Sequence, residues 1–176
     1  MIEVVAYDPS WIDHFGKLKN WYEPVCREFD LLSIEHVGST SVPGLAAKPI
    51  IDIDIVVSRG TVPRAIQAFE SHGHLCRGDL GITDRYAFSV VEPPFMTNTY
   101  VIVEDSVALR NHLTLRQVLR ESPELRREYS VIKRQIAAST TDIRDYSWAK
   151  TGVIQKILTY GGMDDESLRL IRNQNE

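Results

Sequence analysis

Residues 35–57 have the sequence EHVGSTSVPGLAAKPIIDIDIVV, in which Asp52 and Asp54 alternate with isoleucines. The alternation predicts a β-strand over residues 50–57, because successive side chains of a strand point to opposite faces. Both carboxylates would share one face, about 7 Å apart, and the isoleucines the other. Two carboxylates this close repel each other unless a cation lies between them. Mg²⁺ (or Mn²⁺), a hard ion that prefers oxygen ligands and phosphates, is the expected cofactor.

A glycine-serine turn precedes this strand by about a dozen residues. Gly38, Ser39, Thr40 and Ser41 supply hydroxyl groups and a backbone that a phosphate can approach closely. Lys48 lies between the turn and the strand and could neutralise a phosphate charge; its alternative is an exposed loop lysine. Likewise, two acidic residues at i and i+2 can simply form the solvated face of an edge strand. The combination of turn, lysine and paired aspartates favours a metal or phosphate site.

Length and composition exclude several classes of protein. The 176 residues suit one domain, and 43% hydrophobic with 25% charged residues is ordinary for a globular protein. Apolar runs fall short of the ~18 residues of a membrane helix, and Glu3 and Asp8 interrupt any signal peptide. Cys26 and Cys76 are too far apart to form a metal-ligand pair, so we expect a reduced, cytoplasmic protein. The net charge of −4 argues against non-specific nucleic-acid binding.

Hydrophobic periodicity divides the chain into a sheet-rich part, about residues 1–105, and a helical part, about 106–162. We expect helices beginning after Asp8-Pro9 and over 62–72, 107–120, 123–138 and 142–160, and strands over 31–37, 50–57, 85–91 and 99–103. This order predicts a single α+β domain over residues 1–162 with a helical C-terminal third. Residues 163–176 are charged and rich in asparagine, and we expect them to form a mobile tail.

Motifs along most of the chain resemble those of a known family. They are Ile2–Trp11, Glu35–Leu45, Lys48–Ile53, His112-Leu113, Arg116, Leu119-Arg120, Pro123, Tyr129, Lys133, Tyr146 and Lys150. Over about residues 2–160 the chain resembles the GrpB family of small bacterial proteins in the nucleotidyltransferase superfamily. The resemblance implies a nucleotidyltransferase-like mixed β-sheet flanked by helices, with Asp52 and Asp54 as the metal-binding pair and Gly38-Ser39 at the phosphate-side turn. It implies no particular substrate.

The chain departs from the family pattern where a third site residue would be expected. The family usually has histidines at the positions of Thr99 and Val101, and often an aspartate at Gln117. Nucleotidyltransferases commonly bring a third carboxylate from such a strand, and here only Glu92 and Glu104, at strand ends, could reach. If the missing histidines and aspartate belong to the site, we expect catalysis to be weakened more than ligand binding.

Several other polar residues have two interpretations. Lys150 lies on the apolar stripe of Tyr146, Val153, Ile157 and Tyr160, and either snorkels outward or reaches into a cleft toward an anion. For His112 and His36 a structural role is favoured over ligand contact. A salt-bridged, solvated face is favoured over phosphate or RNA contact for the basic residues of the helical part, which are Arg116, Arg120, Arg126, Arg127, Lys133 and Arg134. For Arg85, just ahead of a strand, a solvated position is likewise favoured over a phosphate or RNA contact.

The sequence is compatible with two main functions, an enzyme and a ligand-binding protein. A structural or interaction module is a third possibility. The first is a Mg²⁺-dependent nucleotidyltransferase that moves a nucleotidyl group from a nucleotide triphosphate to an unknown acceptor hydroxyl, on a metabolite, a protein or an RNA end. Asp52 and Asp54 would be catalytic and hold the metal, and the nucleotide would contact Gly38, Ser39, Thr40, Ser41, Lys48 and Lys150. The second is a catalytically weak or inactive nucleotide- or metabolite-binding protein that uses the same site.

Overall fold

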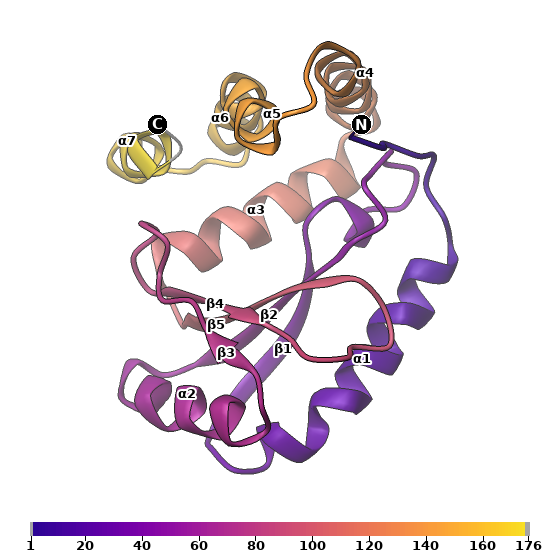
Figure 1. Cartoon of the computed structure of the whole chain (residues 1–176). Coiled ribbons are helices and arrows are strands. Elements are labelled where there is room, and N and C mark those ends of the chain that lie inside the picture. Colours follow the sequence, from indigo (N-terminus) through magenta and orange to yellow (C-terminus); the bar gives the residue numbers. More distant parts are fainter. Residues whose placement is uncertain (1, 175–176) are drawn as a thin grey trace.

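A computed structural model describes residues 2–174 of the protein, in which helices pack on both faces of one sheet (Figure 1). The strands are β1 (Leu31–Val37), β2 (Ile51–Val57), β3 (Leu75–Cys76), β4 (Arg85–Ser89) and β5 (Thr97–Val103). The helices are α1 (Ser10–Cys26), α2 (Val62–Ser71), α3 (Val107–Glu121), α4 (Pro123–Ser139), α5 (Ile143–Ala149), α6 (Thr151–Tyr160) and α7 (Asp165–Gln174). Within this described part, no helix is both long enough and apolar enough to cross a membrane.

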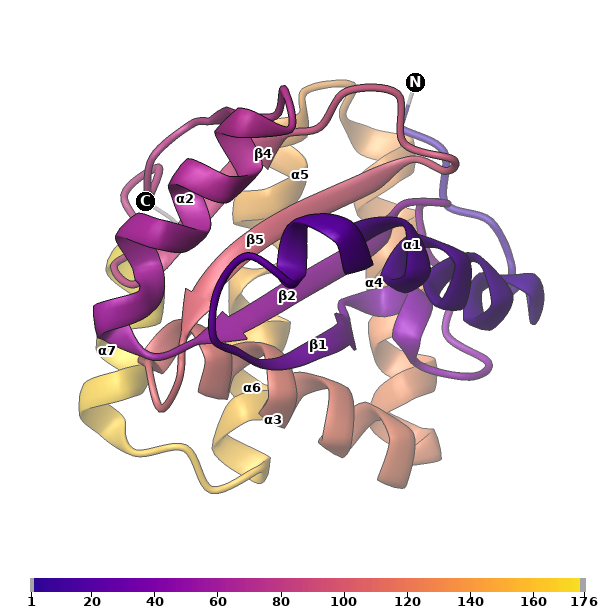
Figure 2. The same cartoon turned by 90° about the horizontal axis from the view of Figure 1, so that it is seen from below.

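The sheet is mixed, with the strand order β1-β2-β5-β4-β3. The β2–β5 pair is parallel, and the other neighbouring pairs are antiparallel. Helices α1 and α2 cover one face, while α3 lies on the other face with α4 to α7 beyond it (Figures 1 and 2). The α+β class and the mixed sheet flanked by helices that the resemblance to nucleotidyltransferase-like folds implied are confirmed.

The alternation in β2 separates the two faces as predicted. Ile51, Ile53 and Ile55 are buried in the main hydrophobic core, together with side chains of α1 and α2. Val56, on the opposite face, packs against Ala108 and Leu109 of α3. Asp52 and Asp54 have the parity of Val56, so the sheet presents both carboxylates to the α3 side.

The helical part differs from the prediction in the region of Lys150. The single helix expected over residues 142–160 is two helices, α5 and α6, with Lys150 between them. Asp142 caps α5 by accepting hydrogen bonds from the backbone N–H groups of Arg144 and Asp145. Gly152, a weak helix former, follows directly after the break. The two-residue strand β3 was also missed, because it is too short to show a periodic pattern.

The prediction of a mobile tail after residue 162 is wrong for the residues that form α7. Leu168 and Ile171 are buried and pack with Leu158 of α6 in a separate small core. Asp164 stabilises the start of α7 by accepting a hydrogen bond from the backbone N–H of Ser167 at 2.8 Å. The charged composition of the segment concealed an amphipathic helix with a narrow apolar stripe. The last two residues of the predicted tail lie outside the described residues.

If α7 is packed on the rest of the protein, truncation of one of its buried side chains should lower the stability, which would not happen in a mobile tail. Leu168→Ala should lower the free energy of unfolding by about 2 kcal/mol, because it removes a buried side chain and leaves a cavity. The matched control is Leu170→Ala in the same helix, where the side chain is 42% exposed and the change should be small. Urea denaturation of both variants measures the difference, and equal stabilities would contradict the docking of α7.

Candidate functional site

The paired aspartates of β2 are held by one neighbour each. Asp52 is partly buried, and its Oδ1 accepts a hydrogen bond of 2.7 Å from the side chain of Asn98, its register partner on β5. Asp54 is fully buried, and its Oδ2 lies 2.7 Å from Nδ1 of His112 on α3. Asp54 Oδ1 is buried and has no hydrogen-bond partner among the described residues. The site therefore contains a carboxylate oxygen that the surrounding described protein leaves unpaired.

Burial and neighbouring charges shift the pKa values of Asp52 and His112 in opposite directions. Burial raises the pKa of Asp52 above its ordinary value, although the Asn98 hydrogen bond and the nearby His112 partly offset it. Burial alone would lower the pKa of His112, but the charge of Asp54 and its hydrogen bond outweigh this and raise it. The site thus favours a cation beside Asp54 and resists an uncompensated negative charge on Asp52.

The glycine-serine turn lies directly against the aspartate pair. Gly38 has φ of +69°, and a Cβ atom there would lie 2.0 Å from Oδ2 of Asp52, so only glycine fits. The hydroxyl groups of Thr40 and Ser41 point inward, to the carbonyl oxygens of Ile50 at 3.2 Å and of Gly38 at 2.7 Å. These two predicted nucleotide contacts therefore use their hydroxyls to hold the turn, whereas the hydroxyl of Ser39 accepts a hydrogen bond from Lys133.

Arginines from α3 fix the turn from the other side. Arg116 donates hydrogen bonds to the carbonyl of His36 at 2.8 Å and to Glu35 at 2.9 Å, and Arg120 donates to the carbonyl of Ser41 at 2.7 Å. Burial, with the charges of these arginines, lowers the pKa of His36 to about 4, so the ring is neutral at pH 7. His36 lies 3.0 Å from the Thr40 hydroxyl and has a structural role. Arg120 is exposed and Arg116 forms an ion pair with Glu35, in keeping with a salt-bridged face, but the sequence did not predict that both also bind the turn.

Three lysines gather beside Ser39. Lys133 is buried, and its ammonium donates a hydrogen bond of 2.8 Å to the Ser39 hydroxyl and another to the carbonyl of Ala46. Lys150 and Lys48 lie 4.3 and 5.5 Å from the ring centroid of Tyr146. Burial, together with the charges of neighbouring lysines, lowers the pKa of Lys133 to about 7 and that of Lys150 to about 8. An anionic ligand would relieve this repulsion.

Lys133 is the site residue that the sequence analysis placed wrongly, on a solvated face. It comes from α4, more than 90 residues after Ser39, so its proximity is a property of the fold. One local signal could have found it: Lys133 follows Tyr129 by four residues, and Tyr129 is itself buried on the same helix face. Asn98 was also missed, because only the register of β5 against β2 places it beside Asp52.

Two cavities meet at the turn and Asp52. One, of about 210 Å³, contains the three lysines and Tyr146, and the other, of about 240 Å³, contains Arg85, Tyr100 and His112. Both are lined by Ser39, Asp52 and Lys150. The structure therefore places Gly38, Ser39, Asp52, Lys48 and Lys150 around two adjoining cavities, both of which reach Asp52.

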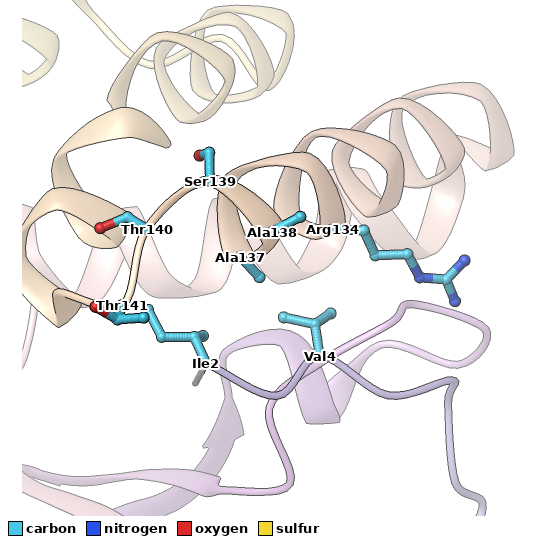
Figure 3. Close-up of a pocket in the computed structure, with 8 residues that line it drawn as sticks. All are labelled: Ile2, Val4, Arg134, Ala137, Ala138, Ser139, Thr140 and Thr141. Carbon is cyan, nitrogen blue, oxygen red and sulfur yellow. The ribbon is translucent and has the colours of Figure 1, made fainter.

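A larger hollow, of about 480 Å³, lies elsewhere, between the N-terminal segment and the end of α4 (Figure 3). Ile2 and Val4 face Ala137 and Ala138 across it, and Arg134 is its one charged residue within the described chain (Figure 3). It lacks carboxylates and paired cations, so catalytic chemistry is not expected there.

Comparison with known proteins agrees with this architecture. A family model described as GrpB protein matches residues 1–160. The chain belongs to the GrpB family. It is 32% identical over 157 residues to the UPF0157 protein YqkA of Bacillus subtilis, and 36% identical over 163 residues to a UPF0157 protein of Pseudomonas aeruginosa. These matches cover 85% and 89% of this chain, but only 46% and 66% of the two relatives.

A solved GrpB structure has the same fold. The crystal structure of conserved protein GrpB from Enterococcus faecalis superposes with a TM-score of 0.78 at 30% sequence identity. The match covers 90% of this chain and 96% of that one. The arrangement of sheet and helices described above is therefore shared with another GrpB protein over nearly its whole length.

The residues at which this chain departs from the GrpB pattern lie away from the aspartates. Thr99 and Val101 belong to the strand next to β2, as expected, but they are buried on the opposite face of the sheet, and Thr99 hydrogen-bonds the Tyr22 hydroxyl at 2.6 Å. Gln117 is exposed on α3 and bonds to Glu121. These departures do not remove ligands from the site.

Neither candidate for a third carboxylate is brought to the aspartate pair. The backbone N–H of Glu104 bonds to the carbonyl of Val57, at the end of β2 opposite to Asp52. Glu92 is exposed in the segment after β4. Among residues 2–174 no group of three or more His, Cys, Asp or Glu side chains is arranged to hold a metal ion. A metal here would take its remaining ligands from water or from a bound phosphate.

Proposed function

We propose that this GrpB protein is a Mg²⁺-dependent nucleotidyltransferase that transfers a nucleotidyl group from a nucleotide triphosphate to the hydroxyl of an acceptor. The observation that carries the proposal is the direct contact of the Gly38–Ser39 turn with Asp52, at the point where three lysines converge. Phosphate-binding groups and metal-type carboxylates are thus adjacent, which phosphoryl chemistry requires.

The residues present fit a divalent cation. Asp52 and Asp54 would hold Mg²⁺ or Mn²⁺, and the unpaired Asp54 Oδ1 is a buried oxygen of the type that such an ion prefers. Two carboxylates, with phosphate and water oxygens, are a usual ligand set for Mg²⁺. When bound, the ion would neutralise phosphate charge and activate the attacking oxygen.

The lysines and Ser39 would bind the terminal phosphates. Lys133 already donates to Ser39, and Lys48 and Lys150 face the same cavity. In the reaction the acceptor oxygen bonds to the α-phosphorus as the bond from that phosphorus to the β-bridging oxygen breaks. Pyrophosphate leaves, and the hydroxyl proton passes to water. The lysines would stabilise the charge on the departing pyrophosphate.

A second candidate is a nucleotide- or metabolite-binding protein without turnover. The specific observation in its favour is that neither Glu92 nor Glu104 lies at the aspartate pair and that, among the described residues, no group of three such side chains is arranged to hold a metal ion. Ligand binding depends on the lysines and the turn, and both are intact. The two candidates therefore share the same binding prediction and differ in turnover.

Calorimetric titration of the four ribonucleoside triphosphates, with and without Mg²⁺, tests the site. We expect Mg²⁺-dependent binding of at least one nucleotide that Asp52→Asn and Asp54→Asn each weaken by at least about tenfold, because each substitution removes an anionic oxygen ligand. Asp30→Asn, at an exposed position outside the site, is the matched control and should bind normally.

The outcomes separate the candidates. Absence of nucleotide binding in the wild-type protein would contradict both, and binding that survives both substitutions would contradict the metal site. Metal-dependent binding with no pyrophosphate release, even in the presence of a cell extract of small molecules, would favour the binding protein over the transferase.

A further inference from the structure

Arg85 differs from the other arginines that pack near the site. Its guanidinium carbon lies 4.4 Å from the ring centroid of Tyr100, and its Nε is buried without a hydrogen-bond partner among the described residues. Arg116, Arg120 and Arg126, in contrast, all donate to carboxylate or carbonyl oxygens. A buried donor without an acceptor costs free energy, so Arg85 is a cationic group prepared for an acceptor that the described protein does not provide.

The surroundings of Arg85 indicate where that acceptor would lie. Arg85 lines the cavity of about 240 Å³, together with polar side chains of Asn111 and His112 and with apolar ones such as Leu115. At Ser39, Asp52 and Lys150 this cavity adjoins the one that contains the three lysines. A molecule in the Arg85 cavity would therefore reach Asp52 from a space that Lys48 and Lys133 do not line, while Lys150 lies at the boundary of the two cavities.

We infer that the Arg85 cavity binds the acceptor, and that the acceptor is a small molecule with both a hydroxyl and a carboxylate group, the carboxylate being held by Arg85. The inference rests on the proposed nucleotidyltransferase function and names its second substrate class. The hydroxyl of the acceptor would lie toward Asp52, and its carboxylate would lie at the Arg85 guanidinium, next to the Tyr100 ring.

A carboxylate fits this cavity better than a phosphate does. Arginine presents a planar fork that matches a carboxylate in two parallel hydrogen bonds, and here the guanidinium carbon lies 4.4 Å from the centroid of the Tyr100 ring. Asp52 lines the same cavity and would repel a doubly charged phosphate more strongly than a singly charged carboxylate. Lys150 lines both cavities and supplies one positive charge here, whereas Lys48 and Lys133, which would compensate the second charge of a phosphate, line only the other cavity. The volume suits a small molecule.

Glycerate is a suitable probe, because glycerol lacks its charge and glycerol phosphate replaces its carboxylate. Each is titrated into ¹⁵N-labelled protein without nucleotide, and the Nε–H signals of the arginines are followed by NMR. The Arg85 signal is identified by its loss in Arg85→Gln. We expect glycerate to shift this signal, glycerol to leave it unchanged and glycerol phosphate to bind more weakly than glycerate.

Variants assign the effect to Arg85. Glycerate affinity should fall by at least about tenfold in Arg85→Gln and stay unchanged in the control Arg77→Gln, which removes an exposed arginine. If Arg85→Gln does not fold, Arg85→Lys keeps the charge without the fork and should still weaken glycerate binding.

Three results would overturn the inference. They are no binding of glycerate to the wild-type protein, equal binding to the Arg85 variants, and tighter binding of glycerol phosphate than of glycerate. Because nucleotide is absent from these titrations, their failure is distinguishable from a failure of the proposed function, which the nucleotide titrations above report separately.

Discussion

Gly38→Ala is expected to lower the free energy of unfolding by about 2–4 kcal/mol and to abolish nucleotide binding. The backbone of Gly38, with φ of +69° and ψ of −171°, occupies a region that is essentially restricted to glycine. The new methyl group would also meet Oδ2 and Cγ of Asp52, at 2.0 and 2.7 Å before any relaxation. Relief of that clash must move either the turn or the carboxylate, and both belong to the site.

Thermal denaturation measures the loss of stability, which should appear as a fall in Tm of about 5–15 °C. Gly60→Ala is the matched control, because a Cβ atom there meets nothing within 4 Å and the backbone needs no positive φ. A Gly38→Ala variant as stable as the Gly60→Ala variant, with unchanged nucleotide affinity, would show that the contact between the turn and Asp52 is unimportant.

The free energy of unfolding should increase as the pH rises from 7 to about 8.5, because Lys133 is buried. Burial lowers the pKa of Lys133 to about 7 in the folded protein, whereas it is about 10.4 in an unfolded chain. Between these values the unfolded state binds the additional proton, so the free energy of unfolding increases with pH. The expected gain over this window is about 1–2 kcal/mol. Above it the buried Cys26 thiol, whose pKa burial raises to about 12, acts in the opposite direction.

Urea denaturation of the wild type and Lys133→Met across this pH range isolates the effect. The variant should show a smaller pH dependence, the remainder coming from Lys150, whose lowered pKa of about 8 acts in the same direction. It should also bind nucleotide more weakly, since it removes the cation next to Ser39. Lys19→Met, at an exposed position on α1, should keep the wild-type slope. Parallel pH profiles for the wild type and Lys133→Met would contradict the depressed pKa of Lys133.

Features that depend on the pattern of neighbouring residues could be predicted from the sequence. The alternation of Asp52 and Asp54 with isoleucines correctly assigned the strand and its two faces, because side-chain parity in a strand is a property of neighbouring residues. Gly38 was recognised for the same reason, as a turn residue at a fixed distance before the strand. The fold class followed from the order of such elements.

The features that were missed depend on register or on distant packing. Thr99 and Asn98 are adjacent in sequence, and only the pairing of β5 with β2 decides that Asn98 faces Asp52 while Thr99 faces the opposite core. Lys133 looked like a surface lysine among charged neighbours, and its burial follows from the docking of α4 over the turn. The residue pattern within a single helix or strand does not reveal which distant segments pack against it.

Helix α7 offers a way to engineer the protein. It supplies Gln174 to the wall of the Arg85 cavity, yet it spans Asp165–Gln174, beyond the residues 1–160 that the GrpB model matches. The lysine-lined cavity, in contrast, is built from residues between Ser39 and Lys150, all within that match. The α7 wall of the Arg85 cavity, which includes Ile171 and Gln174, is thus separable in sequence from the residues that build the lysine-lined cavity. Exchange of this one helix between family members becomes a route to new acceptor selectivity without disturbing the nucleotide end.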